Sequence, residues 1–252
     1  MPSLAPGPER RTDDSRKENR AIDLAARVLH RDAAMIILDK PPGIAVHQGA
    51  GAGDHLEAHF AALRFGADEN PGLAHRLDKD TSGCLVLGRD KAALARLGLL
   101  FRNGYVTKTY WAIVMGRLPA MSGTIDAPLA RRSDDKRSWR MKTDPAGDPS
   151  VTHWRVLGEA DGLTWLELRP KTGRTHQLRV HCANLGTPIA GDHVYGGDLA
   201  RAGARHMHLH ARTITVPFDR PNPVTASAPP PDHMHDLLRA CGWQAMGDES
   251  ND

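Results

Sequence analysis

Short apolar runs alternate with turn signals through the middle of the chain, and this pattern predicts several strands. The run AMIILDK ends at the prolines and glycine of PPG (41–43), and CLVLG (84–88) is short and almost wholly apolar. Runs of this length that are bounded by proline or glycine favour strands over helices. A further strand is expected in YVTKTYWAIVMG (105–116). Two strand-like runs also flank Asp161-Gly162, which is the strongest hairpin signal in the chain.

Helical features occur in fewer segments. The candidates are 54–66, 91–104, 173–186 and 232–240. Asp90 can cap the second of these helices, and Gly104 and Gly186 can end the second and third. Because predicted strands outnumber helices and many follow one another directly, we expect an α+β fold with much antiparallel pairing.

The two ends of the chain differ from the middle. Residues 1–20 are rich in proline and then in charge, with little apolar surface to bury, so they are predicted to be a disordered arm. The polar residues 244–252 are expected to be a disordered tail. The remaining residues, 21–243, are expected to form one catalytic domain.

Charge and cysteine content narrow the class of protein only modestly. The chain has 33 Lys and Arg against 30 Asp and Glu, and a net charge of +3 permits an anionic partner without requiring one. Its 3 cysteines are far apart and form no CxxC pair, which argues against a disulfide framework or a zinc cluster. No long apolar run predicts a membrane span, and no signal-peptide pattern occurs at the start. A cytoplasmic location fits best.

Opposing charges gather in the stretch AHRLDKDTSG (74–83), directly before an apolar strand. Loops that enter rigid elements often carry catalytic groups. If this segment is extended, the carboxylates of Asp78 and Asp80 share one side. The alternative is a solvated charged turn in which Asp80 only caps the residues after it.

A second polar cluster lies in RPKTGRTHQLRVH (169–181). If a helix begins at about Thr175, His176 and Arg179 share a side, and the backbone N–H groups near Gly173 can bind an anion. The alternative is a basic, solvent-facing helix. Periodicity does not choose between Arg174 and Arg179 as the partner of an aspartate.

Tyr110 lies within a predicted strand, where a core or interface aromatic is the usual interpretation. No serine or cysteine has an evident base nearby in the sequence, and no glycine-rich phosphate loop occurs. The chemistry that these residues could support is a carboxylate acting as nucleophile or base, kept ionised by a buried arginine.

Three motifs together resemble those of the RluA-type RNA pseudouridine synthases. They are HRLDKDTSG (75–83), KTYWAIVMG (108–116) and TGRTHQLRVH (172–181), and they occur in that family's order. Weaker matches follow in GTPIAGDHVYGG and HMHLHARTITV. The resemblance covers about residues 27–219, and three motifs in order make it specific.

The resemblance implies that the chain converts uridine to pseudouridine in RNA without a metal, nucleotide or organic cofactor. It implies a central, mostly antiparallel sheet flanked by helices, with a cleft across the middle. Asp78 matches the catalytic aspartate, Tyr110 the tyrosine that stacks on the flipped base, and Arg179 the arginine that pairs with the aspartate. Arg76 matches the position that enters the RNA where the target base has left. Asp80 is assigned no catalytic role.

RNA contacts are expected beyond these residues. The further candidates for RNA binding are His75, Lys108, Lys171, Arg174 and His176. The basic segment 130–142 could contact phosphates, although an exposed charged loop is the plainer interpretation. Many relatives carry a small RNA-binding domain before the catalytic one, and this chain has only a polar arm there. RNA recognition is therefore expected to come from the catalytic domain, the arm or the segment 130–142. The expected partner is ribosomal or transfer RNA, with no obligate protein partner evident.

Two other classes of protein remain open at this point. A metal-dependent hydrolase could use His206, His208 and His210, which would share a face if they alternate along a strand, with Asp192 and His193 nearby in sequence. A non-catalytic RNA-binding module could use the same basic surfaces.

Overall fold

Ten strands form one sheet in the computed structural model, which describes residues 22–49, 53–133, 139–197, 204–219 and 221–245. The main strand order is β1-β2-β4-β11-β5-β10-β9-β6, while β3 pairs with β4 and β12 with β11. The pairing of β4 with β11 is parallel and every other pairing in this sheet is antiparallel. The predicted α+β class is confirmed. The predicted arm (1–20) and most of the predicted tail lie outside the described residues.

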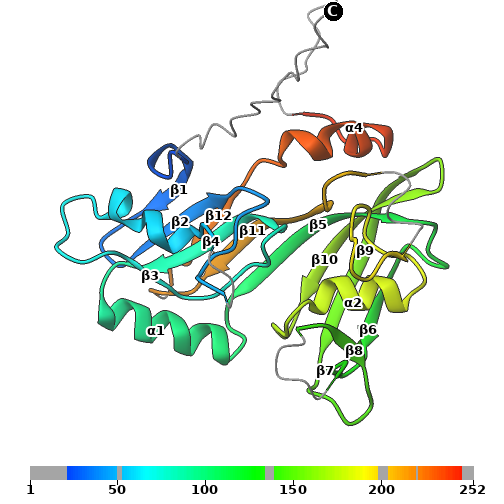
Figure 1. Cartoon of the computed structure of the whole chain (residues 1–252), viewed down its shortest axis with the longest axis horizontal. Coiled ribbons are helices and arrows are strands. Elements are labelled where there is room, and N and C mark those ends of the chain that lie inside the picture. The colour runs from blue at the N-terminus through cyan, green and yellow to red at the C-terminus, as the bar shows by residue number, and fades with distance from the viewer. Residues whose placement is uncertain (1–21, 50–52, 134–138, 198–203, 220, 246–252) are drawn as a thin grey trace, which may run out of the picture.

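One half of the sheet carries the first strands of the chain (Figure 1). Its elements are η1 Ala25–Arg27, β1 Val28–Arg31, β2 Met35–Lys40, η2 Leu56–Leu63, β3 Gly72–Leu73, β4 Ser82–Gly88, α1 Lys91–Arg102, β11 Leu209–Val216 and β12 Val224–Ser227. Every residue of β4 is buried, as its apolar run predicts. Asp90 caps α1 by accepting a hydrogen bond from the backbone N–H of Ala93 at 2.7 Å. The segment predicted as a helix at 54–66 forms the 3-10 helix η2.

The other half of the sheet is built from β5, β10, β9 and β6. Its elements are β5 Thr107–Met115, β6 Ser122–Asp126, β7 Leu129–Arg131, β8 Met141–Thr143, β9 Val151–Ala160, β10 Leu163–Pro170, α2 Gln177–Asn184 and α4 Asp232–Ala240. The hairpin between β9 and β10 turns at Asp161 and Gly162, whose φ angles are 47° and 76°. Two consecutive positive φ angles are typical of a type I′ turn, and they confirm the hairpin that the sequence predicts there.

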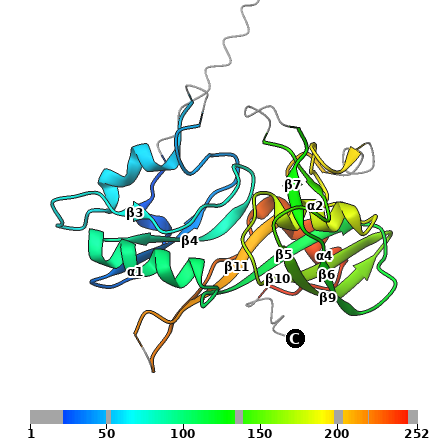
Figure 2. The ribbon, with the colours of Figure 1, turned by 90° about the horizontal axis from the view of Figure 1, so that it is seen from below.

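The two faces of β5 and β10 are covered by different helices. Ala112, Val114 and Leu166 pack with Leu178 and Cys182 of α2. The alternate residues Ile113 and Trp165 pack with Met234 and Leu238 of α4. Because side chains alternate between faces along a strand, α2 and α4 lie on opposite faces of the sheet. Figure 2 shows α1 beside β3 and β4 and α2 in the half formed by β5 and β10.

A close approach of β4 to β11 positions the loop that precedes β4. Gly83 has a φ of +102°, and a Cβ atom there would lie 2.3 Å from the carbonyl oxygen of Ala211. Glycine is therefore required for the two strands to pair at this point. Ala211 pairs with Gly83 on one side and with Tyr110 of β5 on the other. The charged loop and Tyr110 are thus separated by a single strand.

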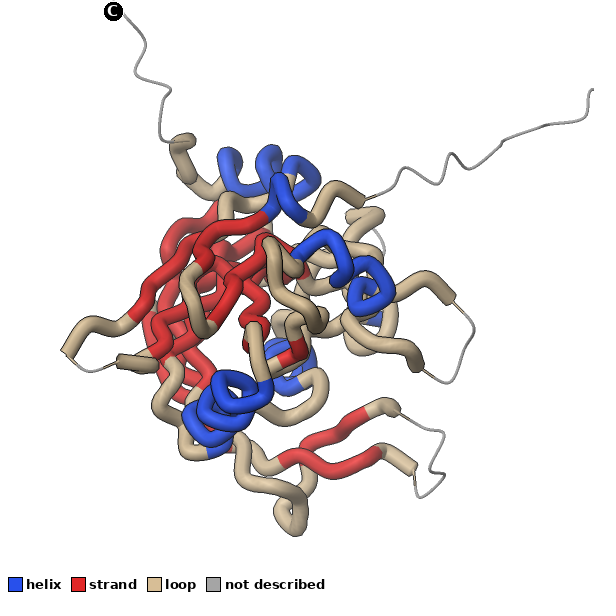
Figure 3. Tube along the Cα trace, turned by 90° about the vertical axis from the view of Figure 1, so that its left-hand side faces the viewer, coloured by secondary structure: helices blue, strands red, loops and turns tan. Residues whose placement is uncertain are grey.

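The strands β7 and β8 form a separate two-stranded ribbon that projects beside the main sheet (Figure 3). This ribbon contains the described part of the basic segment 130–142. Within the described residues, no helix has the length and apolar character needed to cross a membrane.

Candidate active site

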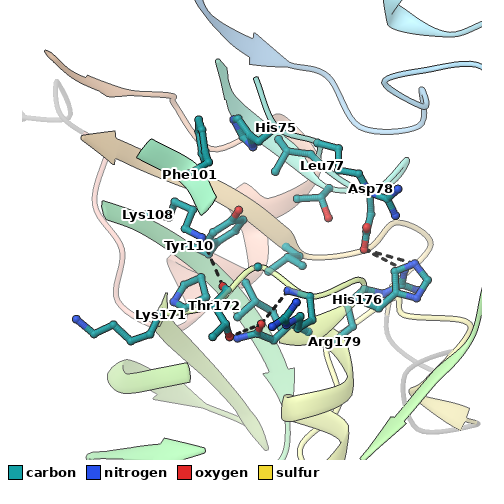
Figure 4. Close-up of a pocket in the computed structure, with 18 of the residues that line it drawn as sticks. His75, Leu77, Asp78, Phe101, Lys108, Tyr110, Lys171, Thr172, His176 and Arg179 are labelled. Carbon is teal, nitrogen blue, oxygen red and sulfur yellow. Dashed lines mark hydrogen bonds and ion pairs between the residues drawn. The ribbon is translucent and has the colours of Figure 1, made fainter. Parts of the chain in front are cut away.

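A pocket of about 490 Å³ brings together every residue that the sequence predicts for the site (Figure 4). It is lined from the loop before β4, the end of α1, β5, the loop after β10 and α2. The nine predicted residues that line it are His75, Arg76, Asp78, Lys108, Tyr110, Lys171, Arg174, His176 and Arg179.

Arg179 holds two carboxylates at once. Its Nε and Nη2 donate to Oδ2 and Oδ1 of Asp192 at 2.7 and 2.8 Å, and its Nη1 donates to Oδ2 of Asp78 at 3.4 Å. The Asp192 side chain is fully buried, whereas that of Asp78 is 21% exposed and reaches the pocket. The bidentate ion pair with Asp192 fixes the plane of the guanidinium, so Nη1 points at Asp78.

Asp192 is the main partner of Arg179, and the sequence analysis did not identify it in this role. Its Oδ1 also accepts backbone N–H groups of Val194 and Tyr195 at 2.9 and 3.1 Å. Burial raises the pKa of Asp192, but the hydrogen bonds and charge of Arg179 outweigh burial and hold that pKa below its usual value. Burial likewise opposes the charge on Arg179, yet Asp192 and Asp78 raise its pKa overall. The sequence signal that could have pointed to Asp192 as part of this site was the weak family match in GTPIAGDHVYGG.

The helix that carries Arg179 begins later than predicted, at Gln177 instead of about Thr175. His176 precedes it with a φ of 53°, in the left-handed region that costs a histidine about 1 kcal/mol. The first six residues of α2 are buried, so the solvent-facing alternative is wrong. The amide oxygen of Gln177 accepts hydrogen bonds from Thr172 and from the backbone of Arg174, which closes the turn before the helix.

The imidazole of His176 lies between Asp78 and Tyr195. Its Nε2 is 3.8 Å from Oδ2 of Asp78, and its Nδ1 is 2.7 Å from the hydroxyl of Tyr195. That hydroxyl accepts the backbone N–H of Met141 at 2.9 Å, so its own proton is available to Nδ1. Burial lowers the pKa of His176, against the charge of Asp78, which raises it. A neutral imidazole with its Nε2–H toward Asp78 follows from this arrangement.

Tyr110 forms part of the pocket wall opposite α2, and Figure 4 shows its ring and the Asp78 carboxylate facing the same cavity. The ring packs against the hydrophobic clusters on both halves of the sheet. Burial raises the pKa of Tyr110, and the charge of Asp78 raises it further. The phenol is therefore uncharged at neutral pH.

Lys40 supports the loop that carries Asp78, a role that the sequence analysis missed. Its side chain is fully buried, and Nζ donates to the carbonyl oxygens of Pro41, Lys79 and Thr81 at 2.8, 3.0 and 2.9 Å. Burial lowers the pKa of Lys40 to about 7, against the charges of nearby aspartates. The sequence gave no signal of this role, because Lys40 is distant from the motif at 75–83 along the chain and a lysine at the end of a strand is ordinarily solvent-exposed.

Lys79 and Asp80 form a turn and are exposed, so Asp78 and Asp80 do not share the side that an extended segment would give them. Only Asp78 of this pair lines the pocket. The turn separates the two carboxylates because Lys40 draws the carbonyl groups of Lys79 and Thr81 inward.

Two of the residues expected at the RNA interface, His75 and Lys108, are held in the pocket wall. His75 stacks on Phe101 with ring centroids 4.4 Å apart, and its Nε2 accepts the backbone N–H of Val86 at 3.0 Å. Burial lowers the pKa of His75 to about 3, so it carries no charge for a phosphate. Lys108 donates to the carbonyl oxygen of Thr172 at 3.4 Å, and burial lowers its pKa. Both positions therefore build the pocket wall.

The remaining cations lie at the rim. Arg76 is exposed and donates to the hydroxyl of Thr175 at 3.4 Å. Arg174 pairs with Asp148 at 3.9 Å and donates to the carbonyl oxygen of Pro149, whereas Arg179 is the arginine that contacts Asp78. Lys171 and Arg102, a further cation that the sequence analysis did not single out, also line the pocket.

The histidines proposed as metal ligands do not alternate along a strand. Strand β11 begins at Leu209, so His206 and His208 precede it. His206 is exposed, while His208 donates to the carbonyl oxygen of His206, and buried His210 contacts Ser82 and the carbonyl of Ala228. Among the described residues, no group of three or more His, Cys, Asp or Glu is arranged to hold a metal ion.

Comparison with known proteins places this geometry in a family. A family model described as RNA pseudouridylate synthase matches residues 34–184. An uncharacterized RNA pseudouridine synthase of Zymomonas mobilis is 44% identical over 215 residues, which cover 85% of this chain and 98% of that protein. Ribosomal large subunit pseudouridine synthase D of Xanthomonas campestris is 37% identical over 236 residues, covering 86% of this chain and 70% of that protein.

A solved structure supports the same assignment. Human RNA pseudouridylate synthase domain containing 4 has a TM-score of 0.70 and 30% sequence identity, and the match covers 86% of this chain and 94% of that one. The chain belongs to the RNA pseudouridine synthase family, whose enzymes isomerise uridine to pseudouridine in RNA. The hydrolase and the non-catalytic module are not supported by these comparisons.

Proposed function

We propose that Asp78 is the catalytic group of this enzyme and that Arg179 orients its carboxylate. The observation that supports this proposal is the contact of Arg179 with Asp78 in a pocket that Tyr110 also lines. A carboxylate in this position can act as nucleophile or base on a uridine, which must first leave the RNA stack to reach the pocket. The proposed catalytic unit is Asp78, Tyr110 and Arg179.

Tyr110 is proposed to receive the flipped uracil on its ring and to assist the final proton transfer. An aromatic face contributes about 1–3 kcal/mol of stacking to a base, which offsets the few kcal/mol needed to unstack it. The buried, uncharged phenol suits this environment better than a charged group would.

Changing Tyr110 to phenylalanine is expected to keep RNA binding and slow the chemical step. The ring remains for stacking, while the hydroxyl that assists proton transfer is lost, so the rate should fall by about 10²-fold or more. Single-turnover kinetics of pseudouridine formation measure this effect, and binding is measured in parallel. An unchanged single-turnover rate would remove the proton-transfer role.

Arg76 is proposed to fill the space that the target base leaves in structured RNA. Its guanidinium is planar, exposed at the pocket rim and able to stack on neighbouring bases. We expect Arg76→Ala to reduce activity on a stem-loop substrate more than on a flexible single strand, because only the stem has a stack to restore. Comparing kcat/KM on both substrates tests this prediction, and equal losses would contradict it.

The proposed substrate is ribosomal RNA, with transfer RNA as the second candidate. Support for the first comes from the similarity to relatives named ribosomal large subunit pseudouridine synthase D. Residues 21–243 are proposed to form one catalytic domain, acting in the cytoplasm, which fits three free and buried cysteines. Pseudouridine maps of total RNA from cells with and without the gene should differ at ribosomal sites. A difference confined to transfer RNA would favour the second candidate.

A further inference from the structure

An exposed tryptophan lies beside the candidate active site and has no role in the chemistry described above. Trp139 precedes β8 and is 52% exposed. The other four of the chain's 5 tryptophans are buried or half-buried. Single exposed apolar side chains are common on protein surfaces, so what sets Trp139 apart is its position beside the pocket and the ability of its flat indole face to stack on a base.

Contacts place Trp139 near Asp78. Its ring lies 5.3 Å from the ring of His176, nearly perpendicular at 83°. His176 in turn has its Nε2 3.8 Å from the carboxylate of Asp78. The indole is therefore two contacts away from the carboxylate, on the side of the pocket formed by α2 and the β7–β8 ribbon.

The surroundings of Trp139 suit a nucleic acid. The guanidinium of Arg140 lies 5.9 Å from the indole centroid. Arg76, on the neighbouring loop, donates to Thr175, the residue before His176. An aromatic face with an arginine beside it is an arrangement that can stack on an unpaired base while the guanidinium pairs with a nearby phosphate.

We propose that Trp139 forms a stacking subsite for the base of a nucleotide adjacent to the target uridine. This inference rests on the proposed function, because a uridine that leaves the RNA stack removes a stacking partner from its neighbour. The half-exposed indole replaces that partner just outside the pocket. Its ligand is a nucleobase of unpaired RNA, recognised by its flat face and not by its hydrogen-bonding edge.

The test uses the full chain and two probes, a decamer of uridines and a decamer of the same sugar-phosphate backbone without bases. Binding is measured by fluorescence anisotropy of end-labelled RNA and by quenching of tryptophan emission. The variants are Trp139→Ala, Trp139→Phe, which retains an aromatic face, and Met121→Ala. Met121 is 66% exposed and does not line the pocket, so its variant controls for the loss of exposed apolar surface.

The wild type is expected to bind the uridine decamer more tightly than the decamer without bases. Trp139→Ala should lower affinity for the uridine decamer by about 5- to 100-fold and leave affinity for the backbone nearly unchanged. Trp139→Phe should retain most of the affinity, and Met121→Ala all of it. Quenching should fall in both Trp139 variants, since the emitting ring is gone.

Three results would overturn the subsite: a wild type that does not distinguish the decamers, an unchanged Trp139→Ala variant, or equal losses in the Ala and Phe variants. The last would mean that the indole only packs against His176. Failure of the proposed function would be seen in a different assay, as a wild type that forms no pseudouridine in any cellular RNA. Base-dependent binding at Trp139 is measured independently of that assay, so the two failures can be distinguished.

Discussion

Replacing Asp78 with asparagine is expected to abolish pseudouridine formation, by about 10⁴-fold or to below detection, while RNA binding survives. The change removes the ionised oxygen that faces the pocket and keeps the size of the side chain. Arg179 remains anchored by two hydrogen bonds to buried Asp192, so the fold should be preserved. Chemical mapping of pseudouridine in treated RNA measures activity, and filter binding measures affinity.

Asp80 provides the matched control for this prediction. It lies in the same loop, is exposed, and does not line the pocket. Asp80→Asn should therefore retain activity within a few fold of the wild type. Asp78→Ala should be made alongside, because an asparagine can slowly deamidate back to aspartate. Normal activity in either Asp78 variant would disprove the catalytic assignment.

Local signals in the sequence predict most of the secondary structure. Asp90 as a helix cap, Asp161-Gly162 as a hairpin turn and the helix at Asp232–Ala240 are each found in the structure. These features depend on residues that lie close together in the chain, so their chemistry can be interpreted without tertiary contacts. The order of strands in the sheet depends on distant pairs such as Gly83 and Ala211, which periodicity does not connect.

The difference between local signals and distant contacts also applies to the site. The motifs identified residues that the structure gathers in one pocket, but they did not reveal how those residues are held. Asp192 and Lys40 are distant in sequence from the residues that they support, and each acts through burial, which the sequence does not show directly. His75 and Lys108, predicted as RNA-binding residues, lie in the pocket wall, where burial lowers both pKa values, an effect that the sequence does not show.

Replacing Asp192 with asparagine is expected to destabilise the protein by about 3–5 kcal/mol and to lower activity by at least about 10-fold. The variant leaves the buried guanidinium of Arg179 without its main counter-ion and without the pair that fixes its plane. Because the pKa of Asp192 is depressed in the folded protein, its contribution to stability is present above the ordinary carboxyl value of 3.8 and is lost as pH falls through the folded value. Thermal unfolding at several pH values measures this dependence, which the variant should lack.

Two comparisons separate the electrostatic role of Asp192 from simple packing. Asp148→Asn removes the partner of Arg174 from a largely exposed pair, so stability should change by less than about 1 kcal/mol. The double variant Arg179→Met with Asp192→Leu should recover part of the stability lost in Asp192→Asn, since no unpaired buried charge remains, while the N–H groups of Val194 and Tyr195 still lose their acceptor. It should remain inactive, because Asp78 then has no guanidinium to hold it. Wild-type stability and rate in Asp192→Asn would instead mean that Arg179 needs no second carboxylate.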